Sequence, residues 1–305
     1  MPPDFSPPDF AWPAGLVALL LGLVVGSFLN VCIVRWPEGE SVVRPASRCP
    51  RCGRGVRAYE NVPVLSWLAL RGRCAGCGLP ISPLYPAVEL ATGLAWLAAV
   101  WGYGPTIDGL RVAVFATVLL GIAVTDARRM VIPDGFTLFL LLWALATAVV
   151  SPSSGAITLF ASPLEAFVGA CAGAGAVAII GWLGELAFKK EAMGFGDVTM
   201  MAGVGAALGP ERALLTVILG ALVGAVASVL VLAPVAYVRH RRQGVAAGVA
   251  AGAGGPSGGD VEGEGGGGFE LPPVPFGVFL APAALAALLG GDRMIAWYFA
   301  HVLPS

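Results

Sequence analysis

The chain has 305 residues, of which 57% are hydrophobic and only 12% are charged, and its formal net charge is -1. Soluble domains carry about twice this fraction of charged residues, so the composition excludes an ordinary soluble protein and indicates a membrane protein. The net charge itself says little about partners, because in a membrane protein the placement of charges matters more than their sum. We expect the lipid bilayer as surroundings and no nucleic-acid ligand.

Apolar stretches long enough to form membrane helices follow one another along the chain. A helix needs about 20 apolar residues to cross the bilayer core. Windows of this kind begin near Gly15, Leu84, Gly109, Thr137, Leu164, Leu214 and Gly277. A shorter, Gly-rich stretch at 198–208 is separated from the next window only by Gly-Pro-Glu-Arg, which predicts a turn. We therefore predict an all-α polytopic membrane protein with about eight transmembrane helices.

The basic residues predict the orientation of these helices. Short cytoplasmic connections of membrane proteins are enriched in Lys and Arg. If the N-terminus lies outside, all but three of the 18 basic residues fall on the inside, and the exceptions are Arg111, Arg212 and Arg293. The first residues, MPPDFSPPDF, carry no basic n-region, so we expect the first span to persist and not to be removed as a signal peptide.

Two hydrophilic inserts interrupt the apolar stretches. One is basic and rich in cysteine, and the other is so rich in glycine that we predict a disordered cytoplasmic loop. The predicted organisation is a first helix (1–34), a cysteine-rich cytoplasmic module (35–83), a transmembrane core (84–242), the Gly-rich loop (243–272) and a last helix with the C-terminus (273–305).

Four of the six cysteines form two Cys-x2-Cys pairs, Cys49 with Cys52 and Cys74 with Cys77. Each tight turn can aim two sulfurs at one point, which is the arrangement of a tetrahedral zinc site. Two disulfides are the alternative, but disulfides rarely persist in the reducing cytoplasm where the predicted topology places this module. We therefore predict a zinc module.

Acidic side chains inside or beside membrane helices are candidates for function, because their burial is costly. Asp126 ends the third predicted span and Asp197 opens the sixth, in the sequence MGFGDVTM. The chain crosses the membrane twice between them, so both carboxylates must lie at the same face. Asp134 follows Pro133 at the start of the fourth span, where a helix-end role is the more probable interpretation.

Two carboxylates at one site suit hydrolysis, in which one takes a proton from water and the other donates a proton to the leaving amide. Helix polarity predicts that Asp197, at a helix N-terminus, is the anion and that Asp126, near a C-terminus, holds the proton. Gly194 and Gly196 permit a bend and a close approach of a peptide substrate.

Several motifs together resemble the bifunctional prepilin leader peptidases and N-methyltransferases, which belong to the Gly-x-Gly-Asp aspartic proteases. The matching stretches are GLVVGSFLNVCIVRWP, the paired cysteines, YENVPVLSWLALRGRC, PISPLYPAVEL, DARRMVIPD, MGFGDVTMMA and VPFGVFLAP. They occur in order from about residue 15 to residue 285. One departure is Thr199, at a position where the family usually has Lys.

The resemblance implies an inner-membrane enzyme with Asp126 and Asp197 as catalytic residues. Its expected activity is to cleave the short basic leader of type IV prepilins and type II secretion pseudopilins at the cytoplasmic face. It would then methylate the new N-terminal residue with S-adenosylmethionine. The resemblance implies that the cysteine module binds zinc and belongs to the methyltransferase half of the enzyme. Relatives specialised for other prepilins lack this module.

The position of the methyl-donor site is left open by the sequence. Glu60 and Asn61 beside the zinc module are weak candidates, and Glu89 is a candidate substrate contact with a buried structural role equally possible. GAGAVA from residue 173 and GVGAALG from residue 203 superficially resemble a nucleotide-binding fingerprint, but inside predicted spans we interpret them as surfaces for close helix packing.

Two other classes of function remain as alternatives. The chain could be a membrane assembly scaffold whose zinc module docks partners, or a transporter that uses membrane acids for proton coupling. The clustering of the acids at one face and the absence of an evident inverted repeat speak against transport. The oligomeric state and the identity of the processed pilins do not follow from the sequence.

Overall fold

A computed structural model describes residues 11–150, 159–189, 193–232 and 275–302. Within these ranges the chain is helical and forms no β-strand. The predicted Gly-rich loop at 243–272 and the first ten residues lie outside the described residues.

Apolar helices occupy all eight predicted positions, so the predicted all-α membrane architecture is confirmed. Six of them are long and apolar enough to cross a membrane, whereas α5 and α7 are shorter. Their bounds are α1 (Ala11–Arg35), α3 (Leu84–Tyr103), α4 (Ile107–Arg129), α5 (Asp134–Val150), α6 (Pro163–Phe188), α7 (Phe195–Leu208), α8 (Pro210–Ala227) and α10 (Gly277–His301). A π-helical turn, η3 (Ser228–Leu232), extends α8.

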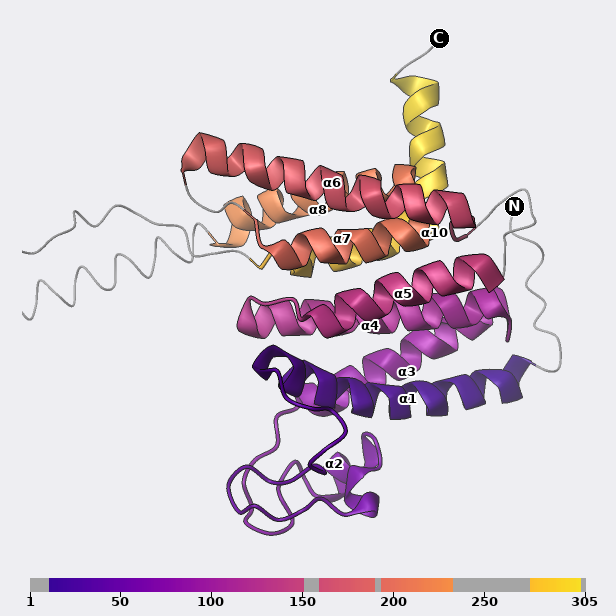
Figure 1. Ribbon diagram of the computed structural model, residues 1–305. Helices are drawn as coiled ribbons and strands as arrows, with labels where there is room; N and C mark the ends of the chain where they lie inside the picture. Colours follow the sequence, from indigo (N-terminus) through magenta and orange to yellow (C-terminus); the bar gives the residue numbers. More distant parts are fainter. Residues whose placement is uncertain (1–10, 151–158, 190–192, 233–274, 303–305) are drawn as a thin grey trace, which may run out of the picture.

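The helices lie side by side in a bundle (Figure 1). Helices α1 and α3 pair at one edge, α4 and α5 form the middle, and α6, α7, α8 and α10 form the other side. Helix α10 packs against α8, α4 and α7, and its C-terminal part projects away from the bundle. The ends of α4, α7 and α10 that carry the candidate site residues all lie at the left in this view.

Glycines let α6 and α7 approach until their backbones touch. A Cβ atom on Gly205 would collide with the carbonyl oxygen of Gly169, and a Cβ on Gly169 would collide with the carbonyl oxygen of Gly205. One turn further along α6, a Cβ on Gly173 would meet the carbonyl oxygen of Met201. The interpretation of both Gly-rich stretches as helix-packing surfaces is therefore confirmed, and this packing fixes the position of α7 and of the acid in its first turn.

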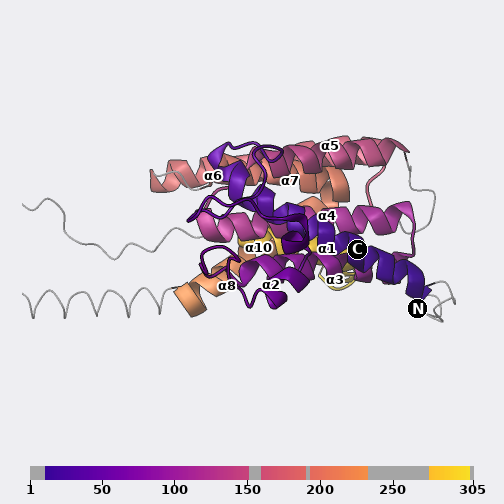
Figure 2. The same cartoon turned by 90° about the horizontal axis from the view of Figure 1, so that it is seen from below.

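The cysteine-rich insert forms a separate small module beside α1, shown from below the bundle in Figure 2. Its regular elements are the short helical turns η1 (Trp36–Glu38), η2 (Ala58–Asn61) and α2 (Leu65–Ala69). Such a module has too little apolar side-chain volume for a core of its own, which is the reason to expect stabilisation by a metal.

The module is attached to the bundle at two places. At the first, the Trp36 ring meets the Phe136 ring of α5 edge to face, with 4.5 Å between the ring centroids, and Glu38 pairs with Arg129 of α4 at 2.8 Å. At the second, the backbone N–H of Val64 donates to the Glu89 carboxylate of α3 at 2.7 Å. These contacts hold the module against the ends of three bundle helices.

Candidate active site

Three helix ends bring the two predicted aspartates together at one end of the bundle. Asp126 lies in the last turn of α4 and Asp197 in the first turn of α7, and both are buried, with exposed fractions of 5% and 8%. Both helix ends lie at the same end of the bundle, as the count of crossings predicts (Figure 1). The residues next to the two acids meet at one side chain, because Gly196, which precedes Asp197, and Gly277, which packs against Asp126, both lie against Ile132.

The carboxylate of Asp126 is held by the N-terminus of α10. The backbone N–H of Val278 donates to Oδ2 of Asp126 at 3.2 Å. The preceding residue, Gly277, packs so closely that a Cβ there would lie 2.9 Å from the same oxygen. The first N–H groups of a helix have no partner within the helix, and its dipole favours negative charge there, so this contact stabilises Asp126 as an anion.

The carboxyl group of Asp197 has the opposite surroundings. Its Oδ1 is buried and finds no hydrogen-bond partner in the described ranges of the chain, while its backbone N–H donates to the carbonyl oxygen of Gly194 at 3.1 Å. A buried carboxyl oxygen without a donor disfavours the charged form, because the lost hydration is not replaced. This geometry favours Asp126 as the anion and Asp197 as the proton carrier, the reverse of the assignment that helix polarity alone predicts.

Ile132, in the connection between α4 and α5, packs against the glycines that neighbour the two aspartates, Gly196 and Gly277. A Cβ on Gly196 would be 2.8 Å from Cβ of Ile132, and a Cβ on Gly277 would be 2.9 Å from its Cδ1. The glycines beside each acid therefore allow both helix ends to close on one apolar side chain. Gly194 is less constrained, since a Cβ there would lie 3.7 Å from Oδ2 of Asp197.

The other residues that the sequence assigns to the active-site loop, and the neighbouring Thr199, lie at helix ends or form contacts within their own helix. Pro133 is buried, and its carbonyl oxygen accepts the N–H of Phe136 at 3.0 Å. Asp134 is exposed at the first position of α5, in keeping with a helix-end role. Thr199 bonds through Oγ1 to the carbonyl oxygen of Gly196 at 3.0 Å, so its hydroxyl is used within its own helix.

The four cysteines of the module converge. One sulfur from each of them lies within 4.8 Å of the others, and Sγ of Cys49 is 3.7 Å from Sγ of Cys77. Tetrahedral zinc with Zn–S bonds of about 2.3 Å requires sulfurs about 3.8 Å apart, so the donor set fits this metal. The backbone N–H groups of Cys52 and then of Arg51 lower the pKa of the Cys49 thiol to about 6, and the thiolate is the form that binds metal.

The three residues considered as further contacts are placed in different ways. Glu60 is held inside the module, where Arg54 donates to Oε1 at 2.7 Å and the N–H of Arg57 donates to Oε2 at 3.0 Å. These two contacts, with the Arg57 N–H contributing most, lower the pKa of Glu60. Asn61 is exposed at the end of η2.

Glu89 has the structural role that the sequence leaves open. Its acceptor contact with Val64 supports a backbone at φ 61°, a conformation that a β-branched residue rarely adopts. This contact favours the structural role for Glu89, as a residue that holds the module to α3, while its candidate role as a substrate contact stays a prediction.

Sequence reasoning missed the α10 residues that touch Asp126. Gly277 and Val278 lie in VPFGVFLAP, a stretch quoted for its family resemblance but given no role. The available signal for this contact was a Gly at the start of an apolar helix that begins at the same end of the bundle as both acids. The contact itself joins residues 152 positions apart, which no local pattern reveals.

Comparisons with known proteins agree with this arrangement. The family model described as Bacterial Peptidase A24 N-terminal domain matches residues 20–103, and the model described as Type IV leader peptidase family matches residues 113–229. The first match contains the cysteine module and the second contains both aspartates. No solved structure matches the chain.

Curated relatives share one printed name, prepilin leader peptidase/N-methyltransferase. The relative from Myxococcus xanthus is 42% identical over 233 residues, which is 74% of this chain and 66% of the relative. The relative from Stutzerimonas stutzeri is 35% identical over 93% of each chain, and that from Aeromonas hydrophila is 32% identical over 96% of each. On this similarity along nearly its whole length, the chain belongs to the type IV leader peptidase family.

Proposed function

We propose that the chain cleaves the leader peptide of type IV prepilins and type II secretion pseudopilins and then methylates the new N-terminal residue. The observation that carries the peptidase half is the pair of buried carboxyl groups, Asp126 and Asp197, at one end of the bundle. The names of relatives that match the chain over its whole length support both halves. The protein is a multi-pass membrane enzyme, and the distribution of its basic residues supports an orientation with the N-terminus outside and the site and module at the cytoplasmic face of the inner membrane.

The two carboxyl groups divide the work of peptide hydrolysis. Asp126, as the anion, removes a proton from a water molecule, and the resulting oxygen nucleophile attacks the scissile carbonyl carbon. Asp197, as the acid, first supports the developing charge on the carbonyl oxygen and then protonates the leaving nitrogen. After cleavage the one proton of the pair lies on Asp126, and its transfer to Asp197 restores the starting state for another turnover.

The surroundings of the pair suit a peptide substrate. The site is at the end of the bundle, and Gly194 precedes Asp197 in an exposed, extended conformation with φ -74° and ψ 148°. A backbone in this conformation, without a side chain, lets a substrate strand approach the acid closely. Residues of the leader beyond the cleavage site would then remain in the aqueous phase.

Zinc, held by Cys49, Cys52, Cys74 and Cys77, would supply the module with structural stability that its own apolar residues do not provide. S-adenosylmethionine supplies the methyl group. The contacts of Glu60 with Arg54 and Arg57 support a role in holding the module together, and Glu89 holds the module to α3.

The peptidase proposal is tested with Asp126→Asn and Asp197→Asn in the full chain, co-expressed with a prepilin. Mass spectrometry of the pilin reports leader removal and the added methyl group in one measurement. Each variant should abolish cleavage, while Asp134→Asn, an exposed acid of the same loop, should leave it intact. Retained processing in both site variants would refute the peptidase proposal and favour a membrane scaffold.

The division of roles is tested without an activity assay. Infrared difference spectroscopy distinguishes a protonated carboxyl group from a carboxylate in the resting protein at pH 7. The band of a protonated, buried carboxyl group should disappear in Asp197→Asn and persist in Asp126→Asn. If the band instead disappears in Asp126→Asn, the proton resides on Asp126 and the assignment from helix polarity is right.

A further inference from the structure

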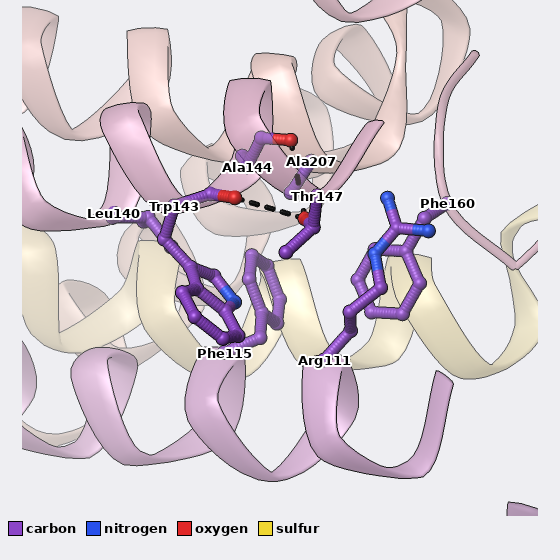
Figure 3. A pocket seen from close by; sticks show the side chains of 8 residues that line it. All are labelled: Arg111, Phe115, Leu140, Trp143, Ala144, Thr147, Phe160 and Ala207. Carbon is purple, nitrogen blue, oxygen red and sulfur yellow. Dashed lines mark hydrogen bonds between the residues drawn. The ribbon is translucent and has the colours of Figure 1, made fainter. Parts of the chain in front are cut away.

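A second buried polar site lies at the opposite end of α4 from the aspartates. Arg111, in the second turn of α4, is only 2% exposed, although Arg is almost never buried without a partner. Fifteen positions separate it from Asp126, or about 22 Å along the helix. Its side chain lines a small pocket between α4, α5 and the segment before α6, together with Phe115, Trp143, Thr147 and Phe160 (Figure 3).

Half of the Arg111 guanidinium is satisfied. Its central carbon stacks on the Phe160 ring at 4.2 Å from the centroid, and Nη1 lies 3.6 Å from the half-exposed carboxylate of Asp108. Nε and Nη2 are buried and have no hydrogen-bond partner among the residues that the structure describes. These two nitrogens point their N–H groups in parallel, and together they form the fork with which Arg binds an anion.

The same fork is occupied in Arg212, elsewhere in the bundle. There Nε donates to Oδ1 of Asp292 at 2.8 Å and Nη2 donates to Oδ2 at 2.9 Å. The comparison identifies what Arg111 lacks, which is an acceptor in the plane of its Nε and Nη2. The guanidinium remains protonated at any physiological pH, so deprotonation cannot remove its need for a hydrogen-bond acceptor.

The pocket offers a third donor and no acidic side chain. Nε1 of Trp143 is also buried and has no partner within the described part of the chain, and the Thr147 hydroxyl donates to the carbonyl oxygen of Trp143 at 2.8 Å. The sequence has no acid between Asp134 and Glu165. Glu165 itself accepts the N–H of Ser162 at 2.9 Å in the cap of α6.

We propose that this pocket binds one small monovalent anion of halide size, chloride under physiological conditions, between the Arg111 fork and the Trp143 N–H. Three buried donors line this pocket without a partner among the described residues, and two of them belong to a cation whose ion pair with Asp108 is long, at 3.6 Å, so the pocket calls for an anion. The pocket has room for a single small particle and is lined mainly by apolar side chains, which excludes a lipid headgroup or a peptide carboxylate. The bound anion neutralises Arg111 and ties α4 to α5.

The test is a thermal unfolding titration of the full chain in detergent. Sodium chloride is compared with sodium gluconate at equal ionic strength, because gluconate is too large for the pocket. Chloride should raise Tm by about 5 °C at a concentration of about 100 times Kd, and above Kd the rise should grow with the logarithm of the chloride concentration. Arg111→Gln should abolish the chloride-dependent rise and Trp143→Phe should reduce it. Arg128→Gln, which removes an exposed charge from the other end of α4, should leave it unchanged.

The wild-type titration decides the matter even if Arg111→Gln does not fold. A Tm that is the same in chloride and gluconate would show that water fills the pocket and would overturn the proposal. An equal chloride-dependent rise in Arg111→Gln or in Trp143→Phe would place the anion elsewhere and would overturn it as well. Both outcomes are independent of peptidase activity, because no step of cleavage is measured.

Discussion

Replacing Gly277 by Ala should disable cleavage while leaving the protein folded. The added Cβ would lie 2.9 Å from Oδ2 of Asp126 and 2.9 Å from Cδ1 of Ile132, and ordinary contact requires at least about 3.4 Å. The helix end and the carboxylate must therefore separate by about 0.5 Å. The Val278 N–H contact, now 3.2 Å, would lengthen to about 3.7 Å, which is no longer a hydrogen bond.

The expected result is a fall in kcat of about 10-fold to 100-fold with little change in KM, because the charged carboxylate loses its donor and its position. The assay is leader cleavage of a purified prepilin by the detergent-solubilised enzyme. The matched control is Gly290→Ala in the same helix, where a Cβ meets nothing within 4 Å and Ala favours the helix. Wild-type kcat in Gly277→Ala would refute the assigned role of the α10 N-terminus.

Two further predictions concern stability. Gly205→Ala forces a Cβ against the backbone of Gly169, and thermal unfolding should show that the free energy of unfolding falls by about 1–3 kcal/mol. The control is Gly175→Ala in α6, where a Cβ meets nothing within 4 Å and the change should be neutral or slightly stabilising. The contacts of Glu60 lower its pKa below the usual 4.5. Its carboxylate therefore contributes its full stabilisation of the module above about pH 4.5, and this contribution is lost as the pH falls through the lowered pKa. Glu60→Gln should therefore lower Tm relative to wild type at pH 7, and the two Tm values should converge as the pH is lowered below 4; a difference that persists at low pH would contradict the linkage.

The parts of the fold that sequence predicts well are those encoded locally. Hydropathy over about 20 residues defines each helix, and the spacing of Cys49, Cys52, Cys74 and Cys77 defines a donor set that converges in the structure. The position of Asp126 and Asp197 at one end of the bundle follows from counting crossings, because a membrane allows only two faces.

The parts that sequence does not predict depend on which helix faces which. Helix polarity suggested the charge on each aspartate from its own helix, but the nearest donor to Asp126 belongs to α10. Similarly, Glu89 is a buried acid in a membrane helix, and only the contact with Val64 distinguishes docking from catalysis. Arg111 was counted as an outside charge, and its burial results from the packing of Phe160 and Trp143 around it.

The double attachment of the module constrains how two reactions can follow one another on one substrate. Trp36 and Glu38 touch the helices that flank the Asp126 loop, and Val64 is fastened to α3, so the module cannot swing away from the peptidase site by bending at a single joint. The proposed methylation, if it takes place at the module, would therefore require the new pilin N-terminus to move there from the aspartates, because the module is held in place.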